Sequence, residues 1–242
     1  MGMALYEKPL KVELENHELI VNGTRYPRSV RTVKDLAKTL MSTSKIEERN
    51  SFDVYYMYRG LVVHSGIRFD ITVMPPGPLG EEYPKTHGHY HPMSSDGVAY
   101  PEAYQVLHGR CTLLLQKRNR SGTVDVIIVE AKMGDVILIP PEYGHVTINT
   151  GKDDLVMSNL VYDKFESVYG DYSTNKGAAY YFLKNGDIVQ NSNYFVNSSE
   201  RMEPRDLNAK YNFSCEDLLS EFNLDPGRFL FLEKPGLLKR SQ

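Results

Sequence analysis

Tryptophan is absent from this chain, and cysteine is rare, at two of 242 residues. Two isolated cysteines, Cys111 and Cys215, do not make the disulfide framework of a small secreted protein. Cys111 lies in an apolar run and is interpreted as a small buried thiol. No apolar run approaches the roughly 20 residues that a membrane helix needs, and the N-terminus shows no cleavage pattern. These absences lead us to expect a cytoplasmic protein without a membrane segment.

An excess of charge of one sign is also missing. The chain has 28 basic and 31 acidic residues, a formal net charge of −3, so neither nucleic acid nor an anionic membrane is an expected partner. Its length fits one large all-β domain or two small domains and is enough to bury a core without disulfides. No internal repeat of solenoid period is visible.

What the sequence does contain is strand periodicity. From residue 52 onwards, apolar and polar residues alternate over short runs that are separated by turn signals such as His108-Gly109 and Thr150-Gly151. About nine strands are predicted, at residues 54–58, 67–73, 102–107, 111–117, 123–130, 136–139, 145–149, 155–162 and 178–183. Strands at hairpin spacing, without a parallel βαβ rhythm, predict an all-β sandwich or barrel of the jelly-roll kind.

The two ends of the chain have a different character. Residues 1–50 are predicted to be a lead-in with a strand at 11–21 and a helix at 32–41, which Thr32 and Asp35 begin as a capping box. Residues 191–242 form a C-terminal extension, in which Ser214 is expected to cap a short helix. An apolar, strand-like run at 229–232 is expected to bury against the barrel or a second subunit. The simplest organisation is a single domain over 1–242, with the barrel at 51–190.

Three histidines within five residues are the first chemical signal. His89 and His91 are two apart, so on a strand both imidazoles point to the same face. His87 shares this parity, but Gly88 marks the start of the strand and His87 is placed at the pocket mouth or on the surface. Glu102 opens a later strand, and His145 opens another after a Pro/Gly turn.

A lone His-x-His is weak evidence, since most histidines are ordinary polar residues. The joint pattern is stronger, because it adds a carboxylate and a third imidazole at the starts of two further strands. Three imidazoles and one carboxylate suit Fe, Mn, Ni, Co or Zn. An octahedral ion held by His89, His91, Glu102 and His145 keeps two positions open for substrate or water, which is an arrangement for catalysis.

This double pattern resembles the two motifs of the cupins. A longer match, through Thr72–Gly77, Lys85–His91, Glu102–Tyr104, Pro140–His145 and Leu160–Tyr162, is similar to the cupin-type glucose-6-phosphate isomerases of archaea and some bacteria. The resemblance covers about residues 50–190 and implies a cupin jelly-roll barrel. The implied activity is the interconversion of glucose 6-phosphate and fructose 6-phosphate, a step of glycolysis and gluconeogenesis.

The resemblance also implies roles for particular residues. It places the 6-phosphate near Thr72, Thr86 and Gly88, two hydroxyls and a backbone amide, with His87 or Lys85 adding charge because no Arg/Lys cluster is visible. Tyr104 and Tyr162 line the sugar pocket, and Glu102 is both ligand and candidate base. Read without the resemblance, the threonines are ordinary strand residues and the tyrosines belong to the core.

The cofactor implied is one divalent metal ion per chain, with Fe²⁺ favoured over Mn²⁺, Zn²⁺ and Ni²⁺, and the expected assembly is a homodimer. The sequence departs from the family in two places. Residues 92–101, ten in all, separate His91 from Glu102, where cupins have three or four, and they are expected to form a loop at the pocket mouth. No histidine follows Tyr162, so Tyr169 or Tyr172 is expected in that position.

Two other classes of function remain open at this stage. A metal-dependent cupin dioxygenase or decarboxylase uses the same four ligands, and a non-enzymatic sugar-binding cupin needs only the pocket. The isomerase itself can follow an enediol route with Glu102 as base or a hydride shift that needs no base. The sequence does not choose between these two routes.

Overall fold

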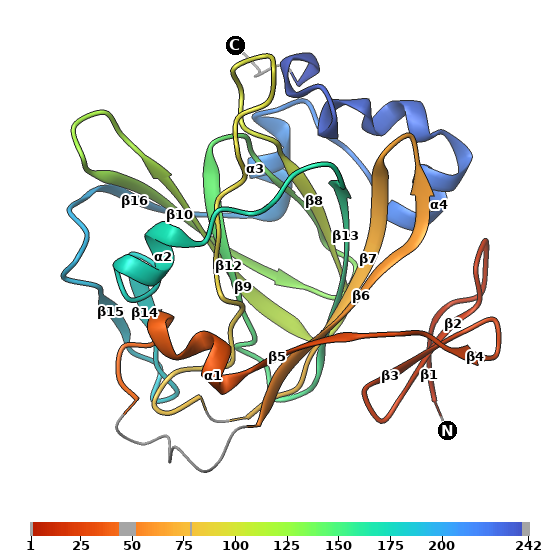
Figure 1. The fold of residues 1–242 in the computed structure, drawn as a ribbon, viewed down its shortest axis with the longest axis horizontal. Helices are drawn as coiled ribbons and strands as arrows, with labels where there is room; N and C mark the ends of the chain where they lie inside the picture. Colours follow the sequence, from red (N-terminus) through yellow and green to blue (C-terminus); the bar gives the residue numbers. More distant parts are fainter. Residues whose placement is uncertain (1, 44–51, 78, 239–242) are drawn as a thin grey trace.

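The computed structural model describes residues 2–43, 52–77 and 79–238. Two β-sheets form the body of the molecule (Figure 1). The larger sheet has the order β11 (Val136–Ile139), β8 (Glu102–His108), β13 (Leu155–Tyr162), β7 (Ile67–Met74), β6 (Asp53–His64) and β5 (Ser29–Thr32). The smaller sheet has the order β12 (Tyr143–Ile148), β9 (Arg110–Arg118), β10 (Val124–Lys132) and β16 (Val196–Met202).

Smaller elements surround this body. The N-terminal strands form a separate sheet of β1 (Met3–Tyr6), β2 (Val12–Glu15), β3 (Glu18–Val21) and β4 (Thr24–Arg25), and a late hairpin joins β14 (Tyr180–Phe182) to β15 (Ile188–Gln190). The helices are α1 (Val33–Leu36), η1 (Ala37–Thr39), α2 (Gly170–Thr174), α3 (Pro204–Ala209), α4 (Leu218–Leu224), η2 (Pro226–Leu232) and η3 (Pro235–Leu237). No helix in the described part of the chain is long and apolar enough to cross a membrane.

Successive strands alternate between the two sheets. β8 belongs to the larger sheet, β9 and β10 to the smaller, β11 to the larger, β12 to the smaller and β13 to the larger. This back-and-forth path is the connectivity of a jelly roll. The prediction of an all-β jelly roll with a few short helices is confirmed, and the predicted strands at 136–139 and 155–162 have the bounds of β11 and β13.

Strand β7 shows how the fold separates the core from the interior of the barrel. Ile67, Phe69, Ile71 and Val73 are fully buried on one face, where the Tyr6 ring of β1 meets Phe69 at 6.0 Å between centroids. The other face carries Arg68, Asp70 and Thr72, because side chains alternate along a strand. The apolar face of β7 is therefore turned outwards, where Tyr6 of the N-terminal sheet covers Phe69, and the polar face is turned inwards.

The C-terminal extension covers the neighbouring part of the same sheet. The Gln105 side chain, on β8, donates to the Glu216 carbonyl at 3.1 Å and accepts from the Leu218 amide at 2.9 Å, which fixes the start of α4. The Asn208 amide group bonds the Leu138 N–H at 2.8 Å and the Val136 carbonyl at 2.7 Å, and thereby satisfies the open edge of β11.

Some of the predictions for the two ends of the chain are wrong. The expected strand at 11–21 is a hairpin of β2 and β3, because Asn16 and His17 take φ values of 49° and 63° and turn the chain. The capping box at Thr32 is present, but α1 stops at Leu36 and a 3₁₀ turn follows.

The C-terminal predictions need similar correction. Asp217, rather than Ser214, caps α4 by accepting from the Ser220 amide at 2.7 Å. Residues 229–232 belong to the 3₁₀ helix η2, which begins after Asp225, and are not a strand. Phe229 and Leu232 are buried, as the apolar run predicts.

Candidate metal centre

Three separate segments bring the four predicted ligands together. Glu102 is the first residue of β8, and His145 lies near the start of β12. His89 is joined to His145 by two backbone hydrogen bonds, of 3.3 and 3.0 Å, so the His89–His91 segment runs beside β12. This segment forms only isolated bridges rather than the predicted continuous strand, but the two-residue spacing still turns both imidazoles inwards. One ligand atom from each residue lies within 4.8 Å of the others.

The ligand atoms meet at one point. His89 Nε2 lies 3.2 Å from His91 Nε2, and Glu102 Oε2 lies 3.5 Å from His91 Nε2 and 3.3 Å from His145 Nε2. Atoms that each bind one ion at about 2.0–2.2 Å, at right angles to one another, are about 3 Å apart. The spacing of these four side chains therefore fits a single transition-metal ion.

Neighbouring groups orient the ligands. His91 Nδ1 lies 2.9 Å from the Tyr100 carbonyl, a geometry in which Nδ1–H donates and Nε2 keeps its lone pair. Glu102 Oε1 accepts from Asn159 Nδ2 at 2.8 Å. Glu102 Oε2 is buried and has no hydrogen-bond partner within the described residues. An anionic oxygen left without a donor among imidazole nitrogens is what a cation site requires, so the residues present fit a metal ion.

The protonation states of the candidate ligands also fit a metal site. Burial lowers the pKa of His91 to about 4 and that of His89 well below its ordinary value, so both rings are neutral near pH 7. Burial works to raise the pKa of Glu102, but the neighbouring His145 and His91 hold it below the usual range. Neutral imidazoles and an ionised carboxylate are the forms that bind divalent metals.

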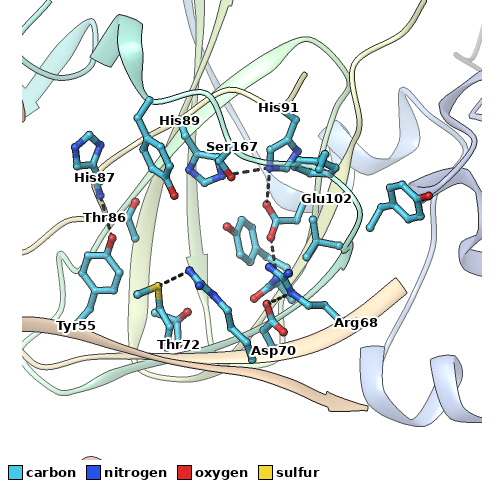
Figure 2. A pocket seen from close by; sticks show the side chains of 18 residues that line it. Tyr55, Arg68, Asp70, Thr72, Thr86, His87, His89, His91, Glu102 and Ser167 are labelled. Atoms are coloured by element: carbon cyan, nitrogen blue, oxygen red, sulfur yellow. Dashed lines mark hydrogen bonds and ion pairs between the residues drawn. The ribbon is translucent and has the colours of Figure 1, made fainter. Parts of the chain in front are cut away.

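The pocket beside this centre contains most of the predicted substrate residues. Thr72, Thr86, Tyr104 and Tyr162 line it together with His89, His91 and Glu102, and Figure 2 shows Thr86 and Tyr55 on one side with Glu102 and Arg68 on the other. The Tyr104 hydroxyl lies 3.2 Å from His145 Nε2. Thr86 Oγ1 accepts from the Thr147 amide at 3.0 Å, so its own hydrogen is free to donate to a ligand.

Gly88 occupies a different place from the other phosphate candidates. It is not among the lining residues of the pocket, and its φ is +80°. A Cβ there would lie 2.6 Å from side-chain atoms of Tyr172 and Val146. The structure therefore explains Gly88 by close packing and a left-handed backbone, and Tyr172 lies behind it, fully buried. Of the two tyrosines expected to replace the family's histidine, Tyr169 is the one that lines the pocket.

The inserted residues 92–101, between His91 and Glu102, contact the metal-site side chains. Besides accepting from His91, Tyr100 stacks its ring on Phe165 at 4.8 Å and on Tyr162 at 5.2 Å between centroids. Phe165 in turn packs on the His91 ring at 4.6 Å. The inserted loop thus holds both the orientation of His91 and an aromatic wall beside it.

The pocket also contains charged side chains that the sequence analysis did not include. Arg59 and Arg68 both line the pocket, with Asp70 and Asn159. Lys85, which was expected to add charge, is instead buried away from it, with Nζ paired with Glu82 and donating to the Thr39 carbonyl at 2.8 Å. His87 does line the pocket, where its ring meets Tyr169 at 5.0 Å.

Sequence reasoning missed these charged residues because they look like the solvent face of strands. Arg68, Asp70 and Thr72 alternate with apolar residues, and alternation alone does not say which face is outside. The usable signal was the position of Arg68 and Asp70 on the same strand parity as Thr72.

Comparison with known proteins now identifies the family. A sequence model described as glucose-6-phosphate isomerase matches residues 30–198. The chain belongs to this family. It is 26% identical over 193 residues to the glucose-6-phosphate isomerase of Thermococcus litoralis, covering 78% of this chain and 96% of that protein. It is 40% identical over 89 residues to putative glucose-6-phosphate isomerase 1 of Rhizobium meliloti, covering 37% and 38%.

Solved structures that are similar to this member of the glucose-6-phosphate isomerase family are more distant. A cupin 2 conserved barrel domain protein from Rhodopseudomonas palustris is 16% identical, with a TM-score of 0.36 over 60% of this chain and 77% of that one. The oxalate decarboxylase of Lactobacillus farciminis, in its formate complex, is 19% identical, with a TM-score of 0.36 over 49% and 31%. The resemblance to cupin-type glucose-6-phosphate isomerases, drawn from the motifs, is confirmed by the family match.

Proposed function

We propose that this chain is a metal-dependent aldose–ketose isomerase that interconverts glucose 6-phosphate and fructose 6-phosphate. The observation that carries the proposal is the convergence of His89, His91, Glu102 and His145 at one end of a polar pocket, in a chain of this family. The proposed cofactor is one divalent ion per chain, Fe²⁺ in preference to Mn²⁺, Zn²⁺ or Ni²⁺. We place the enzyme in the cytoplasm and in glycolysis and gluconeogenesis.

The metal end of the pocket is where the sugar's C1 and C2 would react. A divalent ion bound there would polarise a sugar carbonyl and stabilise negative charge on oxygen. The protein's part is to hold three imidazoles and one carboxylate in place, through the Tyr100 carbonyl at His91 and the Asn159 amide at Glu102. The stacked rings of Phe165 and Tyr100 exclude water from one side.

Glu102 is the candidate base in this arrangement. In an enediol route from glucose 6-phosphate, the Glu102 carboxylate would take the proton from C2 of the open-chain aldose and return it to C1, while the hydroxyl proton of O2 would pass to O1. In a hydride shift the hydrogen passes directly from C2 to C1, and Glu102 serves only as a ligand. Tyr104, whose hydroxyl lies beside His145, is placed to donate a hydrogen bond to a sugar oxygen, because burial and the Glu102 charge raise its pKa well above the ordinary value and keep it protonated.

The opposite side of the pocket would receive the phosphate. Thr72 and Thr86 contribute hydroxyl donors there, whereas Tyr162 lines the pocket beside the stacked rings at His91. Gly88 enters this proposal only through its backbone, since it packs behind the lining residues.

A coupled assay tests the activity directly. Protein reloaded with Fe²⁺ or Mn²⁺ is expected to convert fructose 6-phosphate into glucose 6-phosphate. The product is measured through the reduction of NADP⁺ by added glucose-6-phosphate dehydrogenase. Chelation should abolish turnover, and added metal should restore it. If the reloaded protein turns over neither hexose phosphate, the isomerase proposal fails, and consumption of oxygen with another substrate would point to a cupin dioxygenase instead.

We also propose that the chain is a single domain and assembles as a homodimer. One hydrophobic cluster contains Tyr6 from the lead-in, Ile71 from the barrel and Phe222 from the extension, which supports one folding unit. Light scattering at micromolar concentration is expected to give twice the chain mass of 27.6 kDa. A mass of one chain at that concentration would contradict the dimer and would leave the isomerase proposal intact.

A further inference from the structure

Two arginines line the pocket, and they differ in whether a carboxylate pairs with the guanidinium. Arg68 Nε donates to Asp70 Oδ2 at 2.8 Å, so a carboxylate two residues away on the same strand offsets its charge. Arg59 Nη2 meets only the Met57 thioether sulfur, at 3.2 Å, among the side chains that the structure describes. A thioether is a weak acceptor, so the guanidinium of Arg59 keeps its hydrogen-bonding capacity for a ligand.

An irregularity in the backbone of β6 sets the direction of the Arg59 side chain. The pairing of β6 with β7 shifts register between Tyr58 and Val62, which places a bulge at Arg59 and Gly60. Gly60 has a φ of +73°, a conformation that favours glycine. Bulges re-aim side chains beside functional sites, and here the bulge is on the strand that forms a wall of the pocket.

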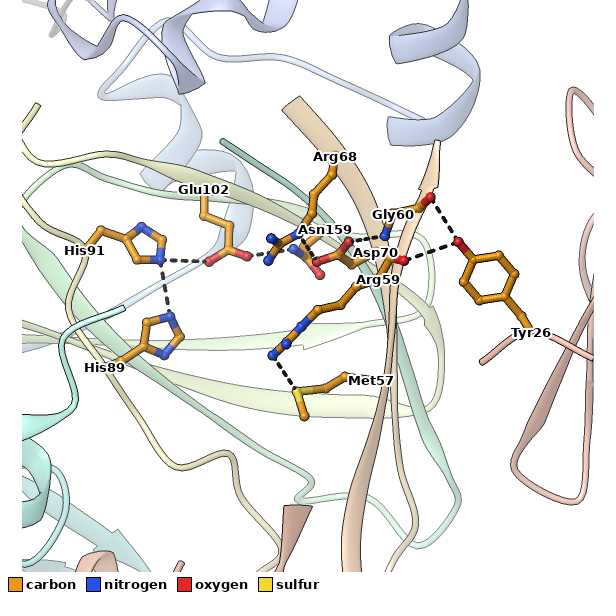
Figure 3. Close-up of polar contacts among 10 residues, drawn as sticks. All are labelled: Tyr26, Met57, Arg59, Gly60, Arg68, Asp70, His89, His91, Glu102 and Asn159. Carbon is orange, nitrogen blue, oxygen red and sulfur yellow. Dashed lines mark hydrogen bonds and ion pairs between the residues drawn. The ribbon is translucent and has the colours of Figure 1, made fainter. Parts of the chain in front are cut away.

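Two side chains hold this bulge. Asp70 Oδ1 accepts from the Gly60 amide at 2.8 Å. The Tyr26 hydroxyl donates to the Arg59 carbonyl at 3.2 Å and to the Gly60 carbonyl at 3.0 Å. Figure 3 shows this chain of contacts running from Tyr26 through Gly60 and Asp70 to Arg68. Asp70 thus neutralises one arginine and positions the other.

The side chain of Arg59 extends towards the phosphate side of the pocket. It reaches back along β6 to Met57, and Met57 is the direct cross-strand partner of Thr72. Figure 3 shows its guanidinium turned to Met57, whereas Arg68 turns to Asp70. Thr72 and Thr86 are neutral donors, and burying a phosphate dianion against neutral donors alone is costly. A guanidinium matches phosphate oxygens with two parallel N–H donors.

We infer that Arg59 binds the phosphate of the substrate together with Thr72 and sets the preference for phosphorylated sugars. Arg68, Asp70 and Tyr26 are positioning residues in this arrangement, because they act on Arg59 or on one another. The inference deepens the proposed function and rests on it for the identity of the sugar. As an independent probe we choose sorbitol 6-phosphate, an open-chain hexose phosphate analogue that has no carbonyl and cannot be isomerised.

The test compares metal-loaded wild type with Arg59→Gln, Arg59→Lys and Arg25→Gln. Arg25 is a surface arginine paired with Glu18 on the N-terminal sheet, so its substitution removes the same charge away from the pocket. Arg59→Gln is expected to weaken sorbitol 6-phosphate binding in calorimetry, and to raise KM for fructose 6-phosphate, by about ten- to a hundredfold. Arg59→Lys should recover part of the loss, and Arg25→Gln should behave as wild type. The metal content should be the same in all four proteins.

The outcomes separate this inference from the proposed function. Wild-type affinity of Arg59→Gln for sorbitol 6-phosphate overturns the role of Arg59, even if the enzyme isomerises fructose 6-phosphate. Loss of metal from Arg59→Gln also overturns it, since the side chain would then be supporting the centre. If wild type shows no isomerase activity but binds the probe in an Arg59-dependent way, the activity is wrong and the phosphate contact stands.

Discussion

His145→Ala is expected to leave far less than one metal ion per chain and to remove most of the isomerase activity. The substitution deletes one of four ligands from a centre whose ligand atoms lie within 4.8 Å of one another, and the remaining two imidazoles and one carboxylate bind a divalent ion much more weakly. Elemental analysis after dialysis against metal-free buffer measures the loss. The coupled assay with fructose 6-phosphate measures its consequence.

His108→Ala is the matched control for this experiment. His108 ends the same strand that Glu102 begins, and it does not line the pocket. Its substitution should leave metal content and activity at the wild-type level. Circular dichroism should show both variants folded, because His145 is buried and its loss carries a stability cost of its own. A folded His145→Ala variant with full metal occupancy would refute the metal centre.

Glu102→Gln is expected to lower kcat/KM by about a hundredfold or more, since even the partners of metal ligands account for about 10–100-fold. The amide keeps the shape and can still accept from Asn159, but it removes the negative charge beside His91 and His145. It cannot serve as a base or as an anionic ligand. Kinetics over a range of added Fe²⁺ or Mn²⁺ separates the two losses, because excess metal rescues a ligand defect and not a missing base.

Two comparisons sharpen the Glu102 result. Glu142→Gln, an exposed glutamate paired with Lys117, makes the same chemical change outside the pocket and should have no effect. Asn159→Leu removes the donor to Glu102 Oε1 and should cost less than Glu102→Gln. Turnover of fructose 6-phosphate by wild type in D₂O tests the route: deuterium at C2 of the glucose 6-phosphate formed shows proton transfer through a base that exchanges with solvent, whereas a hydride shift incorporates none. Normal kcat/KM in Glu102→Gln would show that Glu102 is neither ligand nor base.

Local patterns in the sequence were sufficient for the body of the fold. Alternation predicted the strands that became β7, β9, β10, β11 and β13 within a few residues, because side-chain parity and turn residues are local properties. The same parity rule put His89 and His91 on one face, and it did not depend on a regular strand, since an extended segment with isolated bridges keeps the alternation.

The ends of the chain were less predictable for a physical reason. The run at 229–232 is apolar on all sides, and apolar content alone does not distinguish a strand from a short 3₁₀ helix. The helix is favoured by its N-cap, Asp225, whose side chain accepts from the Gly227 amide at 3.0 Å. Similarly, Gln105 anchors the extension from a residue more than a hundred positions away in the sequence, which no local pattern contains.

The sequence by itself determined the four candidate ligands, the jelly-roll strands and the family, because residue types, spacing and strand parity are written in the order of the chain. Only the tertiary structure decided which face of β7 is the inside. The lead-in covers the apolar face at Phe69, so Arg68 and Asp70 point into the pocket and are not on a solvated surface. Only the structure, again, separated a neutralised arginine from an available one, since that depends on which oxygen lies within 3 Å of each guanidinium. Whether a charged side chain in a pocket is neutralised depends on which groups lie next to it in three dimensions, and the order of residues along the chain does not give these neighbours.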